Sequence, residues 1–259
     1  MAGVSRRGAS PDDPRRWVFN RLAEDYAVRP GYPASLTDRL AALAGAPGAR
    51  VADLGAGTGH LACALAARGL RVSAVEPARA MLDALAAAPA PAGPAVEPVH
   101  AAAEQTGLAA GAFALVVIAD ALHWIDPDRG AREAARLLAP GGALAVVTPR
   151  LADTPFLRAL GERIAQANFK ARPRPPPVGL FFSVAGLPAP AVEPFEDEVR
   201  LEPDALDAVL RSLSYVGPAL GPAALEALLA DARALAAGHG GAAWRREITL
   251  AWARDPRSP

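Results

Sequence analysis

A glycine-rich turn follows a short apolar segment and is the part of the chain best suited to binding a ligand. Residues 51–59 read Val-Ala-Asp-Leu-Gly-Ala-Gly-Thr-Gly, so Asp53 stands just before glycines 55, 57 and 59. Because glycine has no Cβ, backbone N–H groups approach a polar ligand closely, and a helix from His60 would add unpaired donors. The spacing differs by one residue from Gly-x-Gly-x-x-Gly, the dinucleotide-phosphate pattern. The alternative is a tight strand–helix turn that binds nothing.

Two carboxylates accompany this turn. Glu76 ends the next apolar segment, Val-Ser-Ala-Val-Glu-Pro, and a carboxylate there can accept both hydroxyls of a ribose lying over the glycines. The alternative for Glu76 is a solvated acid at the end of a strand. Asp53 is expected to fix the turn by accepting backbone N–H bonds rather than to take part in chemistry.

The elements that must position these residues alternate between strand and helix patterns. Near-continuous apolar runs at 113–119 and 143–148 are typical of strands buried on both faces of a parallel sheet. The alternation indicates right-handed βαβ units and predicts an α/β fold with a doubly wound, mostly parallel, seven-stranded sheet. Its ligand would bind at the carboxyl ends of the strands, where the glycine turn, Glu76, Ala103 and Asp120–Trp124 fall. The other expected elements are strands at 50–54, 70–75, 96–100, 195–201 and 246–253, and helices at about 60–68, 78–87, 129–139, 154–168, 203–213 and 222–237.

The N-terminal region predicts a tail and two helices. Residues 1–12 are expected to be disordered, and Asp13-Pro14 resembles an N-cap and first helical proline that open a helix through about Tyr26. An amphipathic helix then ends near Gly45. We expect one domain over 13–259, made of a helical lid (13–45), a ligand-binding core (46–150), a helical elaboration (151–245) with a stiff proline-rich linker (171–178), and a final strand (246–254).

Length and composition favour a single globular α/β domain and exclude several classes of partner. The 259 residues contain 27 basic and 27 acidic side chains, so no net field favours nucleic acid or an anionic membrane. Cys63 is the only cysteine, so no internal disulfide is expected. The polar N-terminus lacks a signal peptide's apolar stretch, and the uncharged run 175–192 contains five prolines, which predicts a cytoplasmic protein without a membrane helix. His60, His100 and His239 lack metal-ligand spacing, so no metal is expected.

Several stretches, in order, resemble the motifs of class I S-adenosylmethionine-dependent methyltransferases. Val51–Gly59 with Glu76 resembles their first motif and the acid that follows it. Phe19–Pro33 resembles the N-terminal segment of a small-molecule subgroup that includes trans-aconitate methyltransferase-like proteins. Further motifs match at 103–104, 113–117, 121–124 and 138–142. The resemblance implies methyl transfer from S-adenosylmethionine to the oxygen, nitrogen or carboxylate of a small organic acceptor, with S-adenosylhomocysteine as product, by a monomer or homodimer.

The resemblance also implies roles for individual residues. Gly55 and Gly57 would approach the methionine part of the cofactor, and the segment 102–104 would border the adenine. Ala102 stands where a common family pattern has Asp, so adenine recognition would fall to backbone groups near Ala103. The backbone carbonyl at Ala119 or Asp120 would meet the cofactor's amino group. The residues implied to bind the cofactor are Asp53, Gly55, Ala56, Gly57, Glu76, Pro77, Ala103, Glu104, Ala119, Asp120, Tyr26 and Arg29.

The residues implied to face the acceptor come from three separate parts of the chain. Tyr26, Arg29 and Tyr32 resemble a lid in which Arg29 pairs with the methionine carboxylate and Tyr26 lies at the sulfonium. The alternative is structural: the aromatic side chains pack the N-terminal helix onto the domain, and Arg29 lies at the surface. His123 could act as a general base or only shape the pocket. The candidate acceptor-facing residues are Tyr32, His123, Trp124, Phe181 and Tyr215, with Phe181 and Phe182 equally suited to the core.

Two other functions compete with this interpretation. One is a module that binds S-adenosylmethionine without catalysis, which the alanine at position 102 and the lack of a clear base leave open. The other is a nicotinamide-dependent dehydrogenase, which the glycine spacing disfavours. Nothing in the sequence resembles a nucleic-acid reader, because no basic stripe is interleaved with aromatic side chains.

Overall fold

A computed structural model of the protein describes residues 14–89, 93–94, 96–168 and 176–257. The expected disordered tail at 1–12 and most of the proline-rich linker lie outside these residues. In the described part of the chain, no helix combines the length and apolar character needed to cross a membrane.

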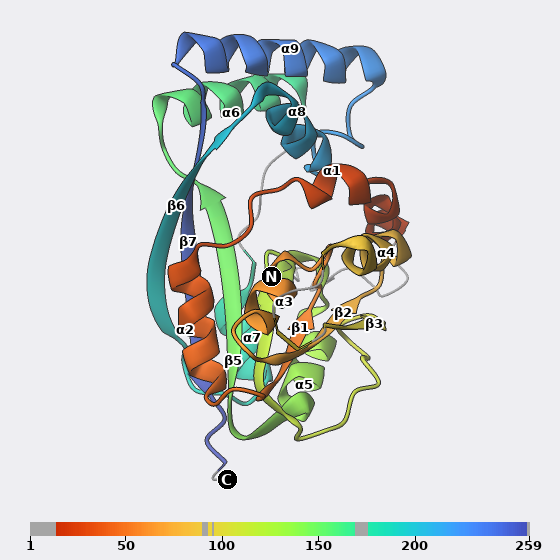
Figure 1. The fold of residues 1–259 in the computed structure, drawn as a ribbon, viewed down its shortest axis with the longest axis vertical. Coiled ribbons are helices and arrows are strands. Elements are labelled where there is room, and N and C mark those ends of the chain that lie inside the picture. The colour runs from red at the N-terminus through yellow and green to blue at the C-terminus, as the bar shows by residue number, and fades with distance from the viewer. Residues whose placement is uncertain (1–13, 90–92, 95, 169–175, 258–259) are drawn as a thin grey trace, which may run out of the picture.

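Seven strands form one mixed sheet in the order β3-β2-β1-β4-β5-β7-β6. Figure 1 shows the long strands β5, β6 and β7 side by side. The strands β1 to β5 run parallel, β7 is antiparallel to β5, and β6 is antiparallel to β7. The predicted α/β fold with a doubly wound, mostly parallel sheet is confirmed. The strands are β1 (Arg50–Leu54), β2 (Arg71–Glu76), β3 (Glu97–His100), β4 (Phe113–Ala119), β5 (Leu138–Leu151), β6 (Ala191–Leu201) and β7 (Ala242–Arg254).

Helices cover both faces of this sheet. Alternate side chains of a strand point to opposite faces, so Leu115 and Val117 of β4 enter one core while Val116 and Ile118 enter the other. The first core packs under α2 (Ala34–Ala44), α3 (His60–Ala66) and α4 (Arg79–Ala87). The second packs under α5 (Pro127–Leu137) and α7 (Val178–Val184).

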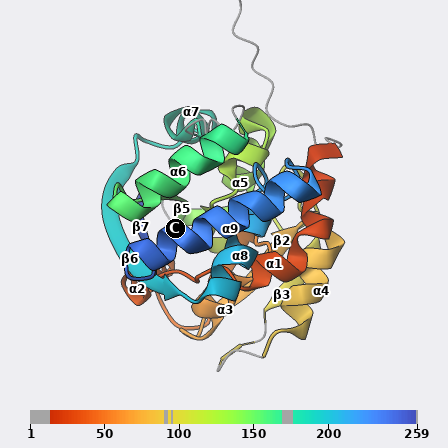
Figure 2. The same ribbon diagram turned by 90° about the horizontal axis from the view of Figure 1, so that it is seen from above.

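A helical cap stands over the carboxyl ends of the parallel strands. It consists of α6 (Pro155–Ala167), α8 (Pro203–Ser212) and α9 (Pro222–Gly238), which share a third apolar core with Trp244 of β7. Figure 2 shows these helices lying across the top of the molecule. The strands β5 and β7 are long, with 14 and 13 residues, and extend from the sheet to the cap. The chain therefore builds a second layer above the edge where its ligand is expected.

The helix expected from Asp13 through about Tyr26 is helical over nearly that range, but it is divided into two pieces of different type. The described segment forms a 3-10 helix, η1 (Pro14–Arg21), and then the five-residue α1 (Ala23–Ala27). Contacts with α4 determine this shape, because Phe19, Leu22 and Tyr26 pack around Met81 in a small core of their own. Tertiary packing thus overrides the local helix signal. The short α1 contacts both α4 and the cap helix α8, so it lies between the sheet and the cap.

Two further differences from the expected elements have local causes. The helix expected from about residue 129 begins at Pro127, because Asp126 caps it by accepting from the N–H groups of Asp128 and Arg129. The strand expected at 143–148 begins at Leu138 and its pairing register with β4 shifts between Phe113 and Leu115, an irregularity typical of a β-bulge. The helix α7 and the 3-10 turn η2 (Leu122–Trp124) were not expected.

Candidate active site

The glycine turn between β1 and α3 has backbone dihedrals that exclude most other residues. Gly55, Gly57 and Gly59 have φ values of 79°, 56° and 82°, in the left-handed region. A Cβ on Gly59 would lie 2.2 Å from a methyl carbon of Leu85. The N–H groups of Gly55 and Ala56 both donate to the carbonyl of Val75, at 2.8 and 3.0 Å. The turn is therefore fastened to the end of β2.

Glu76 is the side chain that completes this turn. Its carboxylate is buried and accepts from the N–H of Gly57 at 3.0 Å and from the N–H of Ala78 at 2.9 Å. The strand–turn–helix geometry predicted from the sequence thus places the carboxylate against the second glycine.

Asp53 lies under the same turn but does not fix it. The expectation that its carboxylate accepts backbone N–H bonds is wrong, because Val75 and Glu76 accept the bonds described above. The side chain is 1% exposed, and its Oδ2 has no hydrogen-bond partner among the described residues. Burial, reinforced by the charge of Glu76, raises the pKa of Asp53 from 3.8 to about 7. A buried acceptor without a donor costs free energy unless a ligand supplies one.

Within the N-terminal region expected to form a lid (13–45), the segment from Ala23 to Pro33 covers this turn. From here on, the lid means residues 23–33. A Cβ placed on Gly57 would lie 3.5 Å from Cε1 of Tyr26. The carbonyl of Ala27 is 3.2 Å from Nε2 of His60, the first residue of α3. The guanidinium of Arg29 lies 4.0 Å from the centre of the Tyr26 ring.

Arg29 joins the lid to the cap and to the sheet. Its Nε donates to Oγ of Ser212 at 2.7 Å and its second amino group donates to the Ser212 carbonyl at 3.0 Å. Its other amino group is 3.7 Å from Oδ2 of Asp120. These contacts are all with other residues of the protein, and the pairing of Arg29 with a cofactor carboxylate stays a prediction.

Asp120 occupies a strained position directly after β4. It is the one non-glycine among the described residues with positive φ, at 52°. Burial raises the pKa of Asp120, while its electrostatic interactions with Arg29, His123 and Arg246 oppose that shift. Burial, followed by the charge of the neighbouring Asp120, raises the pKa of the Tyr32 phenol well above its ordinary value. Acidic, basic and phenolic groups therefore meet at the carboxyl end of β4.

Aromatic side chains form one wall of this region. The rings of Phe19 and Trp124 meet edge to face at 5.1 Å between centroids, and His123 contacts Trp124 at 5.3 Å. His123 is exposed at the surface. Burial of part of its ring lowers its pKa, and the charge of Asp120 acts in the opposite direction. A histidine with a lowered pKa is neutral at pH 7 and able to accept a proton.

Several other predicted site residues have structural contacts that the sequence did not indicate. Phe181 is fully buried in the core under α5, where its ring packs near Gly130, so its assignment to the acceptor pocket is wrong. Glu104 is buried and accepts from the N–H of Asp126 at 2.8 Å, which joins the loop after β3 to the start of α5. Tyr215 is half-buried near Arg29 and Asp120, whose charges act on its phenol.

The remaining predicted residues lie on the loops at the same edge of the sheet. Ala103 is buried against the α5 face, and Ala119 is half-buried at the end of β4. The carbonyl of Pro77 is 3.0 Å from Nε2 of His100.

Sequence reasoning missed three residues that hold the lid. Ser212 binds Arg29, His60 binds Ala27, and Arg246 of β7 donates to the carbonyls of Pro30 and Gly31. Each contact joins residues far apart in the chain, with separations of 183, 33 and 216 positions for Ser212, His60 and the Pro30 contact of Arg246. Spacing along the chain carries no signal for them.

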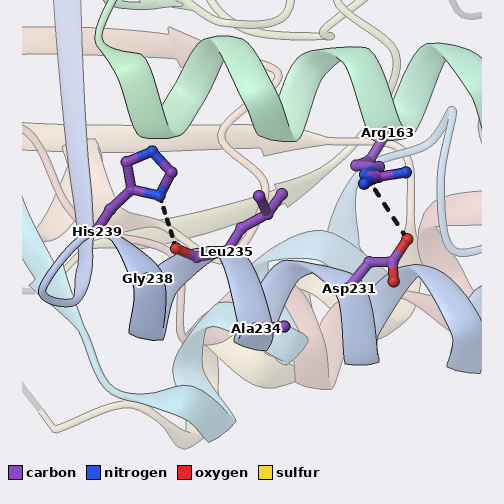
Figure 3. A pocket seen from close by; sticks show the side chains of 6 residues that line it. All are labelled: Arg163, Asp231, Ala234, Leu235, Gly238 and His239. Carbon is purple, nitrogen blue, oxygen red and sulfur yellow. Dashed lines mark hydrogen bonds and ion pairs between the residues drawn. The ribbon is translucent and has the colours of Figure 1, made fainter.

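A surface depression elsewhere does not belong to this site. It lies between α6 and α9. In Figure 3, Arg163 faces Asp231, with 3.9 Å between Nε and Oδ2, and His239 points at the carbonyl of Leu235. It shares no residue with the glycine turn or the lid. Across the described ranges, no group of three His, Cys, Asp or Glu side chains has the arrangement of a metal site.

Comparisons with known proteins agree with this geometry. Residues 52–146 match the family model of a methyltransferase domain. That segment begins in β1, includes the glycine turn and Glu76, and ends in β5. An uncharacterized methyltransferase of Mycobacterium tuberculosis is 41% identical over 147 residues, which are 56% of this chain and 58% of that protein. The chain thus matches little more than half the length of this curated relative.

Solved structures show the fold over nearly the whole chain. A proposed type II methyltransferase from Anaeromyxobacter dehalogenans has a TM-score of 0.61 at 27% identity, covering 89% of this chain and 99% of that one. The (4+2)-cyclase SpnF has a TM-score of 0.55 at 18% identity, covering 97% of this chain and all of that one (100%). The protein has the Rossmann-like fold of class I methyltransferases, and in SpnF a similar fold belongs to a cyclase.

Proposed function

We propose that this protein binds S-adenosylmethionine in the glycine turn between β1 and α3 and transfers its methyl group to a small organic acceptor. The observation that carries the proposal is the turn itself, in which Gly57 meets the buried carboxylate of Glu76 under the Tyr26 ring. The match of residues 52–146 to a methyltransferase domain supports the same conclusion. A subgroup related to trans-aconitate methyltransferases remains our proposal from the sequence resemblance.

The carboxylates and the glycine backbone around the turn suit this cofactor. S-adenosylmethionine carries an ammonium and a sulfonium, and Asp53 offers a buried oxygen without a donor next to the turn. Glu76 offers a carboxylate at the end of β2, where a ribose can be bound through its hydroxyls. The left-handed glycines leave the backbone open to close approach by a ligand.

Bound S-adenosylmethionine would supply an already activated methyl group, so the protein's own work is positioning and the exclusion of water. Tyr26 and Arg29 close the turn from above, and Arg29 neutralises Asp120 at the carboxyl end of β4. Neutral His123 can accept the proton of a hydroxyl or amine acceptor. A carboxylate acceptor carries no such proton and needs no base. Trp124 and Phe19 supply an apolar wall on this side.

A second candidate is a protein that binds S-adenosylmethionine and does not transfer its methyl group. The similarity to SpnF supports this candidate, because SpnF has a similar fold and is named for a cyclase reaction. Ala102 adds to it, because the sequence lacks the side chain that a common family pattern has there. A nicotinamide-dependent dehydrogenase is disfavoured by the glycine spacing.

Calorimetry and a transfer assay test the proposal together. We expect saturable binding of S-adenosylmethionine and S-adenosylhomocysteine and none of NAD, with Glu76→Ala as the matched weak binder. We then expect radiolabelled methyl to appear in at least one compound of a panel of small carboxylates, phenols and amines. Binding without transfer across the panel would favour the second candidate, and saturable binding of NAD alone would overturn both.

A further inference from the structure

Arg246 makes a set of contacts that no catalytic role requires. Its guanidinium donates from Nε to Oδ1 of Asp197 at 2.9 Å and also to Oδ2 of that residue. The same guanidinium donates to the carbonyl of Pro30 at 3.1 Å and to the carbonyl of Gly31. One side chain of β7 thus binds a carboxylate of β6 and two carbonyls of the lid.

This arrangement is buried, and only an arginine can make it. The side chains of Arg246 and Asp197 are 10% and 14% exposed, so little water competes for their hydrogen bonds. The planar fork of a guanidinium serves a carboxylate and two separate carbonyls at once, whereas an ammonium is a compact point charge. Removing one partner leaves the other charge buried without compensation.

The two carbonyls lie at the bend of the lid. Pro30 and Gly31 connect Arg29, which binds Ser212 and faces Asp120, to Tyr32, whose phenol lies near Asp120. Pro30 has no N–H to donate, so its carbonyl is its only backbone hydrogen-bonding group, and Arg246 binds it. Fixing these carbonyls sets the direction in which the flanking side chains leave the backbone.

We propose that Arg246, held by Asp197, is a positioning residue that fixes the lid over the glycine turn so that S-adenosylmethionine binds to a preformed site. The affinity part of this proposal rests on the proposed function. Arg246 acts through the lid backbone and is not a catalytic residue. Its loss leaves the turn, Glu76 and Asp53 unchanged and raises the entropy cost of ordering the lid on binding.

The chain offers a control in a second arginine–carboxylate pair against the same two strands, at a more exposed position. Arg39 of α2 binds both carboxylate oxygens of Glu193 in β6, with Nε contacts of 3.1 and 2.9 Å, and Trp252 of β7 donates to the same carboxylate at 2.7 Å. This arrangement also joins the N-terminal part of the chain to β6 and β7. It makes no hydrogen bond with the lid.

The experiment compares Arg246→Lys with Arg39→Lys in the full chain. Hydrogen exchange of peptides covering residues 22–32 reports the lid, and calorimetry gives the dissociation constant of S-adenosylmethionine. For Arg246→Lys we expect exchange of the α1 amides to be about tenfold faster and the dissociation constant to rise about tenfold, because charge-assisted bonds to the two carbonyls are lost. For Arg39→Lys we expect both quantities to stay within about twofold of the wild type.

Each other result has a defined meaning. Unchanged exchange in Arg246→Lys, or equal effects in both variants, would overturn the positioning role. Faster exchange with unchanged affinity would overturn the part concerning the cofactor. Wild-type protein that binds no S-adenosylmethionine would overturn the proposed function, while the exchange comparison would still decide whether Arg246 holds the lid. If Arg246→Lys does not fold, Asp197→Asn replaces it, with an expected change of about threefold in the same directions.

Discussion

The buried carboxyl of Asp53 makes stability depend on pH in a way that one substitution removes. Its pKa of about 7 in the folded protein lies above the ordinary 3.8, so the folded state keeps this proton to a higher pH than the unfolded chain. The free energy of unfolding must then fall as pH rises between these two values. Integrating the two titrations from pH 5 to pH 7 gives a loss of about 2 kcal/mol from this one group. Asp53→Asn keeps the size of the side chain and has no such proton, so its stability lacks this contribution.

Urea unfolding of the wild type and Asp53→Asn at pH 5 and pH 7 measures this quantity. The difference between the two proteins cancels the titration of all groups that they share. We expect the variant to gain about 2 kcal/mol over the wild type between pH 5 and pH 7. A difference that stays constant within about 0.5 kcal/mol would refute the raised pKa and with it the orphaned state of the carboxylate.

Three further substitutions separate the roles assigned to the site and the core. Glu76→Ala should weaken S-adenosylmethionine binding by about 1–3 kcal/mol, and an unchanged dissociation constant in calorimetry would place the carboxylate away from the ribose. Gly57→Val should abolish binding while the circular dichroism spectrum stays native, because φ at that residue is 56°; retained affinity would locate the cofactor elsewhere. Phe181→Ala should cost about 3–5 kcal/mol of stability in urea unfolding with affinity for the cofactor unchanged, and a weakened affinity would return Phe181 to the site.

The fold could be predicted because its signals are local. The apolar run 113–119 forms a strand with the expected bounds, since a strand buried on both faces tolerates little else. The turn at 55–59 and Glu76 follow from glycine stereochemistry and from the position of a residue at a strand end. The lid is different. The short α1 and the preceding 3-10 helix take their shape from contacts with Met81 of α4, which no local pattern contains.

The parts of the site that could not be predicted depend on long-range contacts or on competition for a donor. Ser212 and Arg246 are ordinary polar residues until the cap and β7 bring them to the lid. Asp53 was expected to accept hydrogen bonds from the turn, but the N–H groups of the turn donate to the carbonyl of Val75 and the carboxylate of Glu76 instead. The sequence fits Phe181 to the pocket and to the core equally well, and only the packing of α7 on α5 places it in the core.

The position of β7 also determines the order in which a growing chain can complete this protein. The strand lies between β5 and β6 in the sheet but is synthesised after both. Until β7 leaves the ribosome, the part of β5 that pairs with it, Ala143–Leu151, has no strand partner on that side and can pair wrongly with other nascent chains. The glycine turn can form long before this point, whereas the bend at Pro30 waits for Arg246. Premature termination before Ala242 would therefore yield a chain with its glycine turn formed and its proposed cofactor site incomplete.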